Sequence, residues 1–117
     1  MAGLNFLKVK LFYIFLFLIF TSKGFSTDFK LEKIVDLDKP WGSSFINNDE
    51  LIITEVGGKI KILNIVSGDI QEIDHNLNFV EYGQGGLLDI IFNIDSIWIS
   101  YTEKRDEWKT STSIAKA

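Results

Sequence analysis

The residues best suited to chemistry lie in a glycine-rich stretch, Gly83-Gln84-Gly85-Gly86, which is followed at once by the apolar run 87–92. Three glycines in four residues permit positive φ angles and close approach of the backbone to a neighbour, so the stretch predicts a tight loop leading into a strand. Gln84 would then stand at the mouth of that strand, where its amide can both donate and accept hydrogen bonds. The alternative is that Gln84 only ties down its own loop.

Other polar groups offer weaker candidates. His75 is the one histidine and lies in a polar stretch, so we expect a solvated loop residue. Four acidic residues lack the spacing of a calcium loop and are expected on a solvated face: Asp36, Asp38, Glu81 and Asp89. The sequence has no Walker loop, Rossmann fingerprint, cysteine pair or Ser–His pairing, so we predict no metal site and no catalytic residue in this chain.

The first 26 residues have the order of a secretory signal. Lys8 and Lys10 precede the apolar run 11–20, and small and polar residues follow at 21–26. The run is short for a bilayer core of ~30 Å, so we expect a helical, cleaved signal peptide over 1–26 and a periplasmic or secreted protein. The alternative is an uncleaved N-terminal anchor that uses residues 4–20.

The part expected to be exported, residues 27–117, is acidic. Three of the 12 basic residues and none of the 16 acidic residues lie before it, which leaves nine basic against 16 acidic side chains, a net charge of −7. Such a surface disfavours nucleic acid as a partner, and membrane contact is expected only through the signal or anchor. Because the sequence has no cysteine, stability must come from a hydrophobic core.

Short β-branched and apolar runs predict an all-β domain. A loosely alternating stretch at 28–38 suggests an exposed strand, and Gly57-Gly58 predicts a hairpin turn. An antiparallel four-stranded meander is expected from the runs 41–46, 51–56, 59–65 and 70–74. Beyond an irregular stretch at 75–82, strands are expected at 87–93, 97–102 and 111–117, with a turn at Asp95-Ser96 and a charged loop at 103–109.

A shift of 46 residues relates the strands on either side of the glycine loop. It places Phe45 on Ile91, Ile46 on Phe92, Asn47 on Asn93, Asp49 on Asp95, Leu51 on Ile97, Ile53 on Ile99 and Thr54 on Ser100. A period of ~40–50 residues built from four short strands is typical of propeller blades. We therefore predict blade 1 at about 37–76 and an incomplete blade 2 at about 84–117. A chance match of two ordinary hairpins is the alternative.

Several motifs recur in a recognisable order: Leu37-Asp38-Lys39-Pro40-Trp41-Gly42, Leu51-Ile52-Ile53-Thr54-Glu55 with 57–60, Tyr82-Gly83-Gln84-Gly85-Gly86-Leu87-Leu88-Asp89, Trp98-Ile99-Ser100-Tyr101, and the closing run 110–117. Together they resemble the glucose/sorbosone dehydrogenase-like family, which includes soluble pyrroloquinoline quinone (PQQ)-dependent aldose sugar dehydrogenases. The resemblance covers nearly all of residues 27–117.

This resemblance implies the N-terminal fragment of an exported six-bladed β-propeller that oxidises a sugar at its anomeric hydroxyl, with hydride transfer to PQQ. Gln84 matches the family's glutamine at the active-site opening, so Gln84, Gly83 and Gly85 are predicted to contact the sugar substrate or the cofactor. A neutral amide can bond a sugar oxygen without competing for the proton being removed. The resemblance also admits calcium in the full-length protein.

Some family positions have no match here. The general-base histidine and the cationic and calcium-linked positions lie in later blades, and His75 matches no catalytic motif. Val56 stands where many relatives carry arginine, and the connection at 93–96 is shorter than usual. Because a general base must lie within hydrogen-bond reach, we expect the fragment alone to be inactive and to self-associate through unpaired sheet edges. Whether it belongs to an enzyme stays open.

Two alternatives remain at this stage. One is a non-catalytic exported β-propeller that binds carbohydrate or protein. The other is a small independent secreted β-domain ending at Ala117, although 111–117 finishes in mid-strand.

The aromatic residues are predicted mainly as core. We expect core between the blades, with a sugar-stacking platform as the alternative, for Trp41, Phe45, Phe92 and Trp98. Trp108 lies among charged residues and is the aromatic expected to be exposed at a loop tip.

Overall fold

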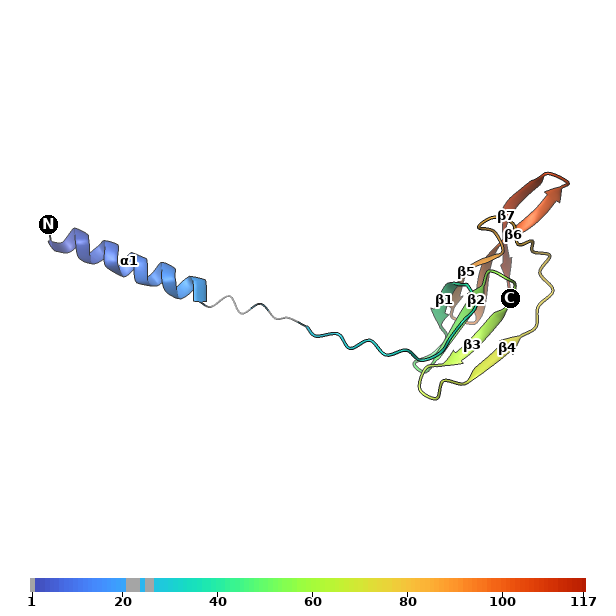
Figure 1. Ribbon diagram of the computed structural model, residues 1–117, viewed down its shortest axis with the longest axis horizontal. Coiled ribbons are helices and arrows are strands. Elements are labelled where there is room, and N and C mark those ends of the chain that lie inside the picture. The colour runs from blue at the N-terminus through green and yellow to red at the C-terminus, as the bar shows by residue number, and fades with distance from the viewer. Residues whose placement is uncertain (1, 21–23, 25–26) are drawn as a thin grey trace. The chain divides into compact units, whose positions relative to one another are not determined.

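The computed structural model describes residues 2–20, 24 and 27–117. The chain divides after Glu32 into two units. The first contains helix α1 (Ala2–Phe20), and all strands lie in the second, Lys33–Ala117 (Figure 1). No helix in these described ranges has both the length and the apolar character needed to cross a membrane. The predicted signal at 1–26 includes residues outside the described ranges, and its cleavage stays a prediction.

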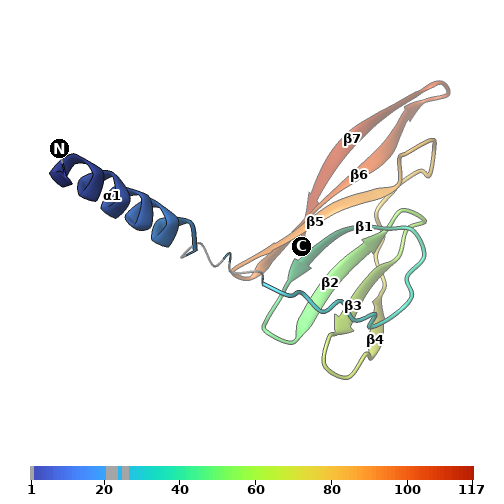
Figure 2. The ribbon, with the colours of Figure 1, turned by 60° about the vertical axis from the view of Figure 1, so that its left-hand side comes forward.

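The second unit consists of two antiparallel sheets (Figure 2). The first sheet contains, in chain order, β1 (Pro40–Phe45), β2 (Glu50–Glu55), β3 (Ile60–Asn64) and β4 (Ile70–Ile73). The second contains β5 (Leu87–Asn93), β6 (Ser96–Asp106) and β7 (Lys109–Lys116). The predicted all-β class and the four-stranded meander are confirmed.

The exposed strand expected at 28–38 is wrong, because no strand is formed there. Within the second unit, residues 33–38 run across the first sheet without pairing to it, and the Asp38 N–H donates to Glu55 Oε1 at 2.8 Å (Figure 2). Lys39 then adopts a φ of 47° directly before Pro40, which turns the chain into β1. Within 33–38, Val35 and Leu37 are half-buried and their neighbours exposed, so this alternation arises without strand pairing.

The charged loop expected at 103–109 is also wrong. Strand β6 continues to Asp106 and β7 begins at Lys109, so only Glu107 and Trp108 form the turn. Cross-strand bonds hold these polar arms together, since Arg105 Nη2 donates to Ser113 Oγ at 2.8 Å. Charged side chains fit here because the arms extend into solvent.

The repeat is present, with one correction. Phe45 pairs with Leu51 and Phe92 with Ile97, so the shift is 46 residues for β2 and β6 but 47 for β1 and β5. The turn after β5 falls at 94–95, one residue before the predicted position. Counted between the paired residues, the connection from Phe92 to Ile97 is one residue shorter than the connection from Phe45 to Leu51. Both hairpins carry a register irregularity at equivalent places, Pro40/Ser43 and Leu87/Ile90. A shared irregularity argues against a chance match of two hairpins.

The core lies between the two sheets. Its buried members are Ile52, Ile60, Leu87, Ile90 and Ile99. Backbones also approach closely, because a Cβ on Gly42 would lie 2.7 Å from the Asp89 Cα. Apolar burial at roughly 25 cal/mol per Å² makes this interface the main source of stability in the unit.

Three of the four aromatic residues predicted as core between the blades lie outside the contact between these two sheets. Trp41, Phe45 and Trp98 are 54, 58 and 44% exposed, while Phe92 is half-buried. Isoleucine and leucine side chains fill the contact between the sheets, and the backbones approach too closely at Gly42 for an indole ring there.

Candidate functional site

The glycine loop is a two-residue hairpin turn. Tyr82 and Gly85 form an isolated bridge, with Gly85 N–H donating to the Tyr82 carbonyl at 2.8 Å and Tyr82 N–H donating in return at 3.3 Å. Gly83 has a φ of 61°, as the first central residue of a tight hairpin turn requires. Gln84 is the second central residue, and it is exposed.

Backbone bonds to both sheets hold this loop. The Gly86 N–H donates to Thr102 Oγ1 at 3.3 Å, and the Leu87 N–H donates to the Val56 carbonyl at 3.2 Å. A Cβ on Gly85 would lie 2.5 Å from Thr102 Oγ1, and one on Gly86 would overlap the Val56 carbonyl. The last two glycines are therefore required by close approach.

The Gln84 side chain has no hydrogen-bond partner among the described residues, so it does not tie down its own loop. The loop geometry instead leaves both amide groups available to a ligand.

The start of β1 and the end of β2 meet this loop at the same end of the sheets. The Val56 N–H donates to the Lys39 carbonyl at 3.1 Å, and Lys39 Nζ lies 3.1 Å from Glu81 Oε1. The hydrogen bond that Lys39 donates to the Glu81 carboxylate, followed by the charge of that carboxylate, raises the pKa of Lys39. Lys39 is thus a protonated side chain beside the loop whose charge is paired with that of Glu81.

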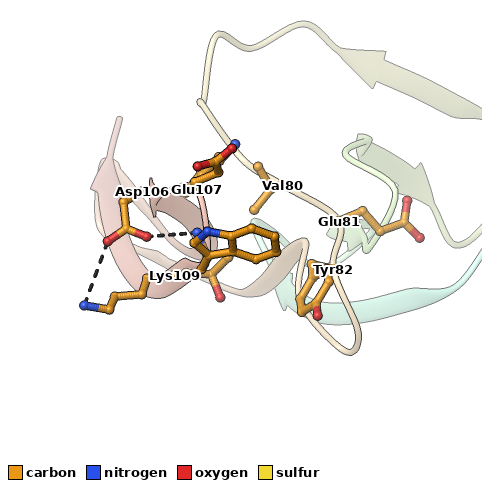
Figure 3. A pocket seen from close by; sticks show the side chains of 9 residues that line it. Val80, Glu81, Tyr82, Asp106, Glu107 and Lys109 are labelled. Atoms are coloured by element: carbon orange, nitrogen blue, oxygen red, sulfur yellow. Dashed lines mark hydrogen bonds and ion pairs between the residues drawn. The ribbon is translucent and has the colours of Figure 1, made fainter.

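A hollow of about 350 Å³ lies next to the glycine loop. It is lined by Val80, Glu81, Tyr82, Lys104, Asp106, Glu107, Trp108, Lys109 and Thr110. Figure 3 shows Glu81 and Tyr82 on the loop segment and Asp106, Glu107 and Lys109 on the β6–β7 hairpin. Trp108 is 89% exposed, which confirms the predicted exposed aromatic, and Tyr82 is 75% exposed. This hollow was not predicted, because the charges at 103–109 indicated a loop and not two paired strands.

His75 differs from its prediction as a solvated loop residue. It is half-buried, and its Nδ1 accepts the Leu77 N–H at 3.2 Å while Nε2 lies 2.6 Å from the Gly58 carbonyl. A carbonyl only accepts, so Nε2 carries the proton and the ring ties the irregular segment to the β2–β3 turn. This role is structural.

The acidic residues considered as ligands do not gather. Across the described ranges, no group of three or more histidine, cysteine or acidic side chains is placed to hold a metal. Asp36 pairs with Lys33 at 2.6 Å, and Asp89 accepts the Ile90 N–H at 2.9 Å.

Two buried polar residues of β2 were not singled out from the sequence. Thr54 is fully buried; its Oγ1 accepts the Gly42 N–H at 3.1 Å and donates to the Leu88 carbonyl, so it joins β1 and β2 to β5. Glu55 is 2% exposed and accepts Lys61 Nζ at 2.7 Å. Burial alone would raise the pKa of Glu55, but the bonds from Lys61 and the Asp38 N–H, with the charges of Lys61 and Lys59, lower it overall. Thr54 and Glu55 therefore hold the end of β2 in place next to the glycine loop, and their buried side chains are not available to a ligand there.

Stacked antiparallel sheets with a repeated hairpin define a repeat-built all-β protein. The family model for Glucose / Sorbosone dehydrogenase matches residues 37–117, and this chain belongs to that family. The resemblance of this chain to the family, which the sequence motifs predicted, is thereby confirmed.

Individual relatives agree. The chain is 32% identical over 84 residues to Aldose sugar dehydrogenase YliI of Escherichia coli (strain K12), covering 67% of this chain and 23% of that protein. The soluble aldose sugar dehydrogenase (Asd) from Escherichia coli, solved in the apo form, matches with a TM-score of 0.62 at 29% identity, covering 68% and 25% of the two chains.

The PQQ-bound aldose sugar dehydrogenase (Adh) from Streptomyces coelicolor matches with a TM-score of 0.60 at 21% identity, covering 69% and 25%, and this likeness concerns the fold. The chain thus spans about a quarter of the length of these relatives.

Proposed function

We propose that this chain forms the N-terminal part of an exported, PQQ-dependent aldose dehydrogenase, in which the glycine loop lines the sugar site. The observation that carries the proposal is the exposed Gln84 amide, held on a turn whose neighbouring backbone bonds to both sheets. The named relatives act as aldose sugar dehydrogenases, which supports the substrate class.

In this role the Gln84 amide orients a sugar hydroxyl, and Gly83 and Gly85 let the chain turn tightly around the ligand. Bound PQQ would accept the hydride. The described residues fit only the rim of a PQQ site, because the Lys39 ammonium beside the loop is already paired with Glu81. The base and the remaining cofactor contacts, including any calcium, would come from further residues of a longer protein, so we assign no proton transfer to this chain.

A six-bladed propeller is the proposed whole. In its support, the two sheets use equivalent positions differently: Ile52, Thr54 and Ile60 of the first sheet are buried against the second. Their register equivalents, Trp98, Ser100 and Ile114, lie on the far face of the second sheet, where Trp98 and Ile114 are 44 and 71% exposed. A further blade would cover this face as the second sheet covers the first.

The test uses the longest reading frame that contains this chain. We expect saturable PQQ binding and sugar-dependent dye reduction. Gln84→Ala should lower kcat/KM by about 10- to 100-fold, the cost of about 1.4–2.7 kcal/mol of lost bonding. Gln71→Ala, at another exposed glutamine, on strand β4, should leave it unchanged. Absence of PQQ binding, or reduction that ignores sugar, would refute the proposal.

A second candidate function is non-catalytic carbohydrate binding by an exported propeller. The exposed aromatic hollow beside the loop favours it, because that surface needs no cofactor. Sugar binding by the longer protein without dye reduction would select this candidate.

Alone, the 117-residue chain should self-associate through its uncovered face and sheet edges, which include the exposed Ile91, Trp98 and Ile114. Light scattering after gel filtration should show an apparent mass that rises with concentration, reduced by Trp98→Lys and not by Trp108→Lys. A sharp, concentration-independent monomeric melt would contradict this expectation.

Export through a signal at 1–26 is part of the proposal. Expression in a bacterial host should yield a periplasmic or secreted product, and mass spectrometry of its N-terminus should find the first 24–26 residues removed. An intact N-terminus in the membrane fraction would support the anchor instead.

A further inference from the structure

We propose that the ion pair between Lys39 and Glu81 positions the glycine loop and so holds the Gln84 amide where a sugar hydroxyl binds. This inference rests on the proposed function, because it concerns how the loop is aimed at that sugar. It makes Lys39 and Glu81 positioning residues, which act through Gln84 and do not touch the substrate.

The backbone at Lys39 is strained. Its φ of 47° lies in the left-handed region, and a residue directly before a proline is itself restricted to extended angles. Two bonds impose this conformation: the Asp38 N–H donates to the buried Glu55 carboxylate at 2.8 Å, and the Lys39 carbonyl accepts the Val56 N–H at 3.1 Å. Such imposed strain is common at functional sites. Glycine would adopt this angle without strain, so any advantage of lysine here lies in its side chain.

The Lys39 side chain reaches across to the segment that enters the glycine loop. Lys39 Nζ donates to Glu81 Oε1 at 3.1 Å, and a Cβ on Gly57 would lie 3.8 Å from Glu81 Oε2, so the carboxylate lies beside the β2–β3 turn. Figure 3 shows the Glu81 side chain pointing away from the labelled residues of the β6–β7 hairpin. Glu81 therefore faces the first sheet.

Both arms of the glycine loop are bonded to the second sheet. The Thr102 carbonyl accepts the Val80 N–H at 2.9 Å, and the Thr102 N–H donates to the Gly86 carbonyl at 2.9 Å. The arm that leaves the loop has a further backbone bond to the residue after β2. For the entering arm, 80–82, the ion pair is the one hydrogen bond to the first sheet or its flanking residues within the described ranges. Loss of the pair would therefore free this arm from the first sheet.

A shift of the entering arm would be passed on to Gln84. Tyr82 follows Glu81 and is bonded to Gly85 in both directions, at 2.8 and 3.3 Å, so the turn moves together with Tyr82. The paired side chains are 66 and 45% exposed, and exposed ion pairs contribute little to folding stability. Because a misplacement of about 1 Å can lower a rate by ~100-fold, we expect the pair to matter more for the reaction than for the fold.

The first test needs no activity and uses the 117-residue chain, with Trp98→Lys as the background to limit self-association. In Glu81→Gln, NMR should show the Gly85 N–H exchanging with solvent about two- to fivefold faster, and the Leu87 N–H at an unchanged rate. The matched control is Glu72→Gln, which removes another exposed ion pair, 3.0 Å long, within the first sheet. This control should leave both rates unchanged. Equal Gly85 exchange in Glu81→Gln and its parent would overturn the inference.

The second test uses the longer protein with PQQ and separates positioning from a merely structural role. Lys39→Gly removes the ion pair but relieves the strained φ, so the urea midpoint should equal that of the parent or exceed it. The value of kcat/KM for glucose should nevertheless fall about three- to tenfold. Exchange of the charges in Lys39→Glu/Glu81→Lys should restore kcat/KM to within about twofold of the parent, and Glu72→Gln should leave it unchanged.

The outcomes distinguish this inference from the proposed function. A charge-exchanged protein as slow as Lys39→Gly, or a fall in kcat/KM that is matched by a fall in the urea midpoint, would overturn the positioning role and leave the dehydrogenase proposal intact. Faster Gly85 exchange in Glu81→Gln, found together with a longer protein that reduces no dye, would support the positioning of the loop and refute the proposed oxidation.

Discussion

The two sheets of this chain are related by a repeat, yet their equivalent hairpins, β2–β3 and β6–β7, differ in length and in packing. In the first sheet, the β2–β3 turn is short and packed, with Gly58 against the Phe79 ring and its carbonyl bonded to His75. In the second, the Ser100–Ile114 pair stands where Thr54–Ile60 stands in the first, so the β6–β7 hairpin is eight residues longer. The turn of this longer hairpin exposes the Trp108 indole to solvent.

This difference separates two uses of one supersecondary unit. The short hairpin closes a sheet and is fixed by buried contacts, whereas the long one adds surface without adding core. Repeats conserve the packing of strands, and loops between them provide sites for ligands. Substitutions should therefore cost stability in the first hairpin and recognition in the second.

The largest expected effect is at Gly58. Its φ of +105° is unsuited to a side chain, and a Cβ would overlap the Phe79 ring, so Gly58→Ala should cost about 4 kcal/mol of unfolding free energy. Glu107→Ala in the turn of the long hairpin should cost less than about 0.5 kcal/mol. Urea denaturation measures both, and similar costs would break the comparison.

Next is the buried ion pair below the short hairpin. Lys61→Met leaves the Glu55 carboxylate without its cation and should cost about 3 kcal/mol at pH 7. Arg105→Met removes the more exposed pair with Glu103, whose side chains are 53 and 23% exposed, and should cost about 0.5 kcal/mol.

The same pair predicts a pH dependence. Because the pKa of Glu55 is lowered on folding, its stabilising effect is present above the unfolded pKa of about 4.3 and is lost as pH falls through the folded value. Melting temperatures between pH 3 and 7 should fall on the acid side in the parent. Lys61→Met removes the bond and the charge of Lys61 that lower the Glu55 pKa, so the fall in melting temperature on the acid side should be smaller in this variant. Superimposable profiles would contradict this assignment.

An intermediate effect is expected where the sheets join. Thr54→Val leaves the Gly42 N–H and the Leu88 carbonyl without their hydroxyl partner and should cost about 2 kcal/mol. The equivalent Ser100 is half-buried and bonds only within its own sheet, to the Asp89 backbone, so Ser100→Ala should cost about 0.5 kcal/mol. Equal losses would mean that the two positions carry similar roles in this chain.

The smallest effect should be a gain. Ile94 has a φ of 57° and is 80% exposed in the turn between β5 and β6. Ile94→Asn should raise the unfolding free energy by about 1 kcal/mol, because asparagine tolerates the left-handed region better than a β-branched residue. The corresponding turn of the first sheet already has Asn47, whose Oδ1 accepts the Asp49 and Glu50 N–H groups at 2.9 Å. An unchanged midpoint would refute the assigned strain.

Much of the fold follows from local patterns. The β-branched runs and the Gly57-Gly58 turn predicted β1 to β4, and the glycines around Gln84 predicted the tight loop. Alternation at 28–38 misled, because half-burial of alternate side chains, as at Val35 and Leu37, does not require strand pairing. The charges at 103–109 misled because charged residues also occur in the exposed arms of a hairpin, where bonds from Arg105 to Ser111 and Ser113 join the two strands.

The candidate site was predicted only in part for the same reason. Gln84 and the exposed Trp108 could be found from neighbouring residues. Their association through Tyr82 depends on how far β6 and β7 extend, and the burial of Thr54 depends on β5, 34 residues away. Long-range pairing of this kind has no signal in a single sequence.

The eight extra residues of the β6–β7 hairpin are divided equally between its two strands. Eight residues shared between two antiparallel arms leave the inward and outward alternation of β6 and β7 undisturbed at the sheet. Length can thus be added or removed there in matched steps, and the reach of the tip becomes adjustable independently of the scaffold. Among relatives of this chain, that hairpin is where we expect changes in ligand size to be accommodated.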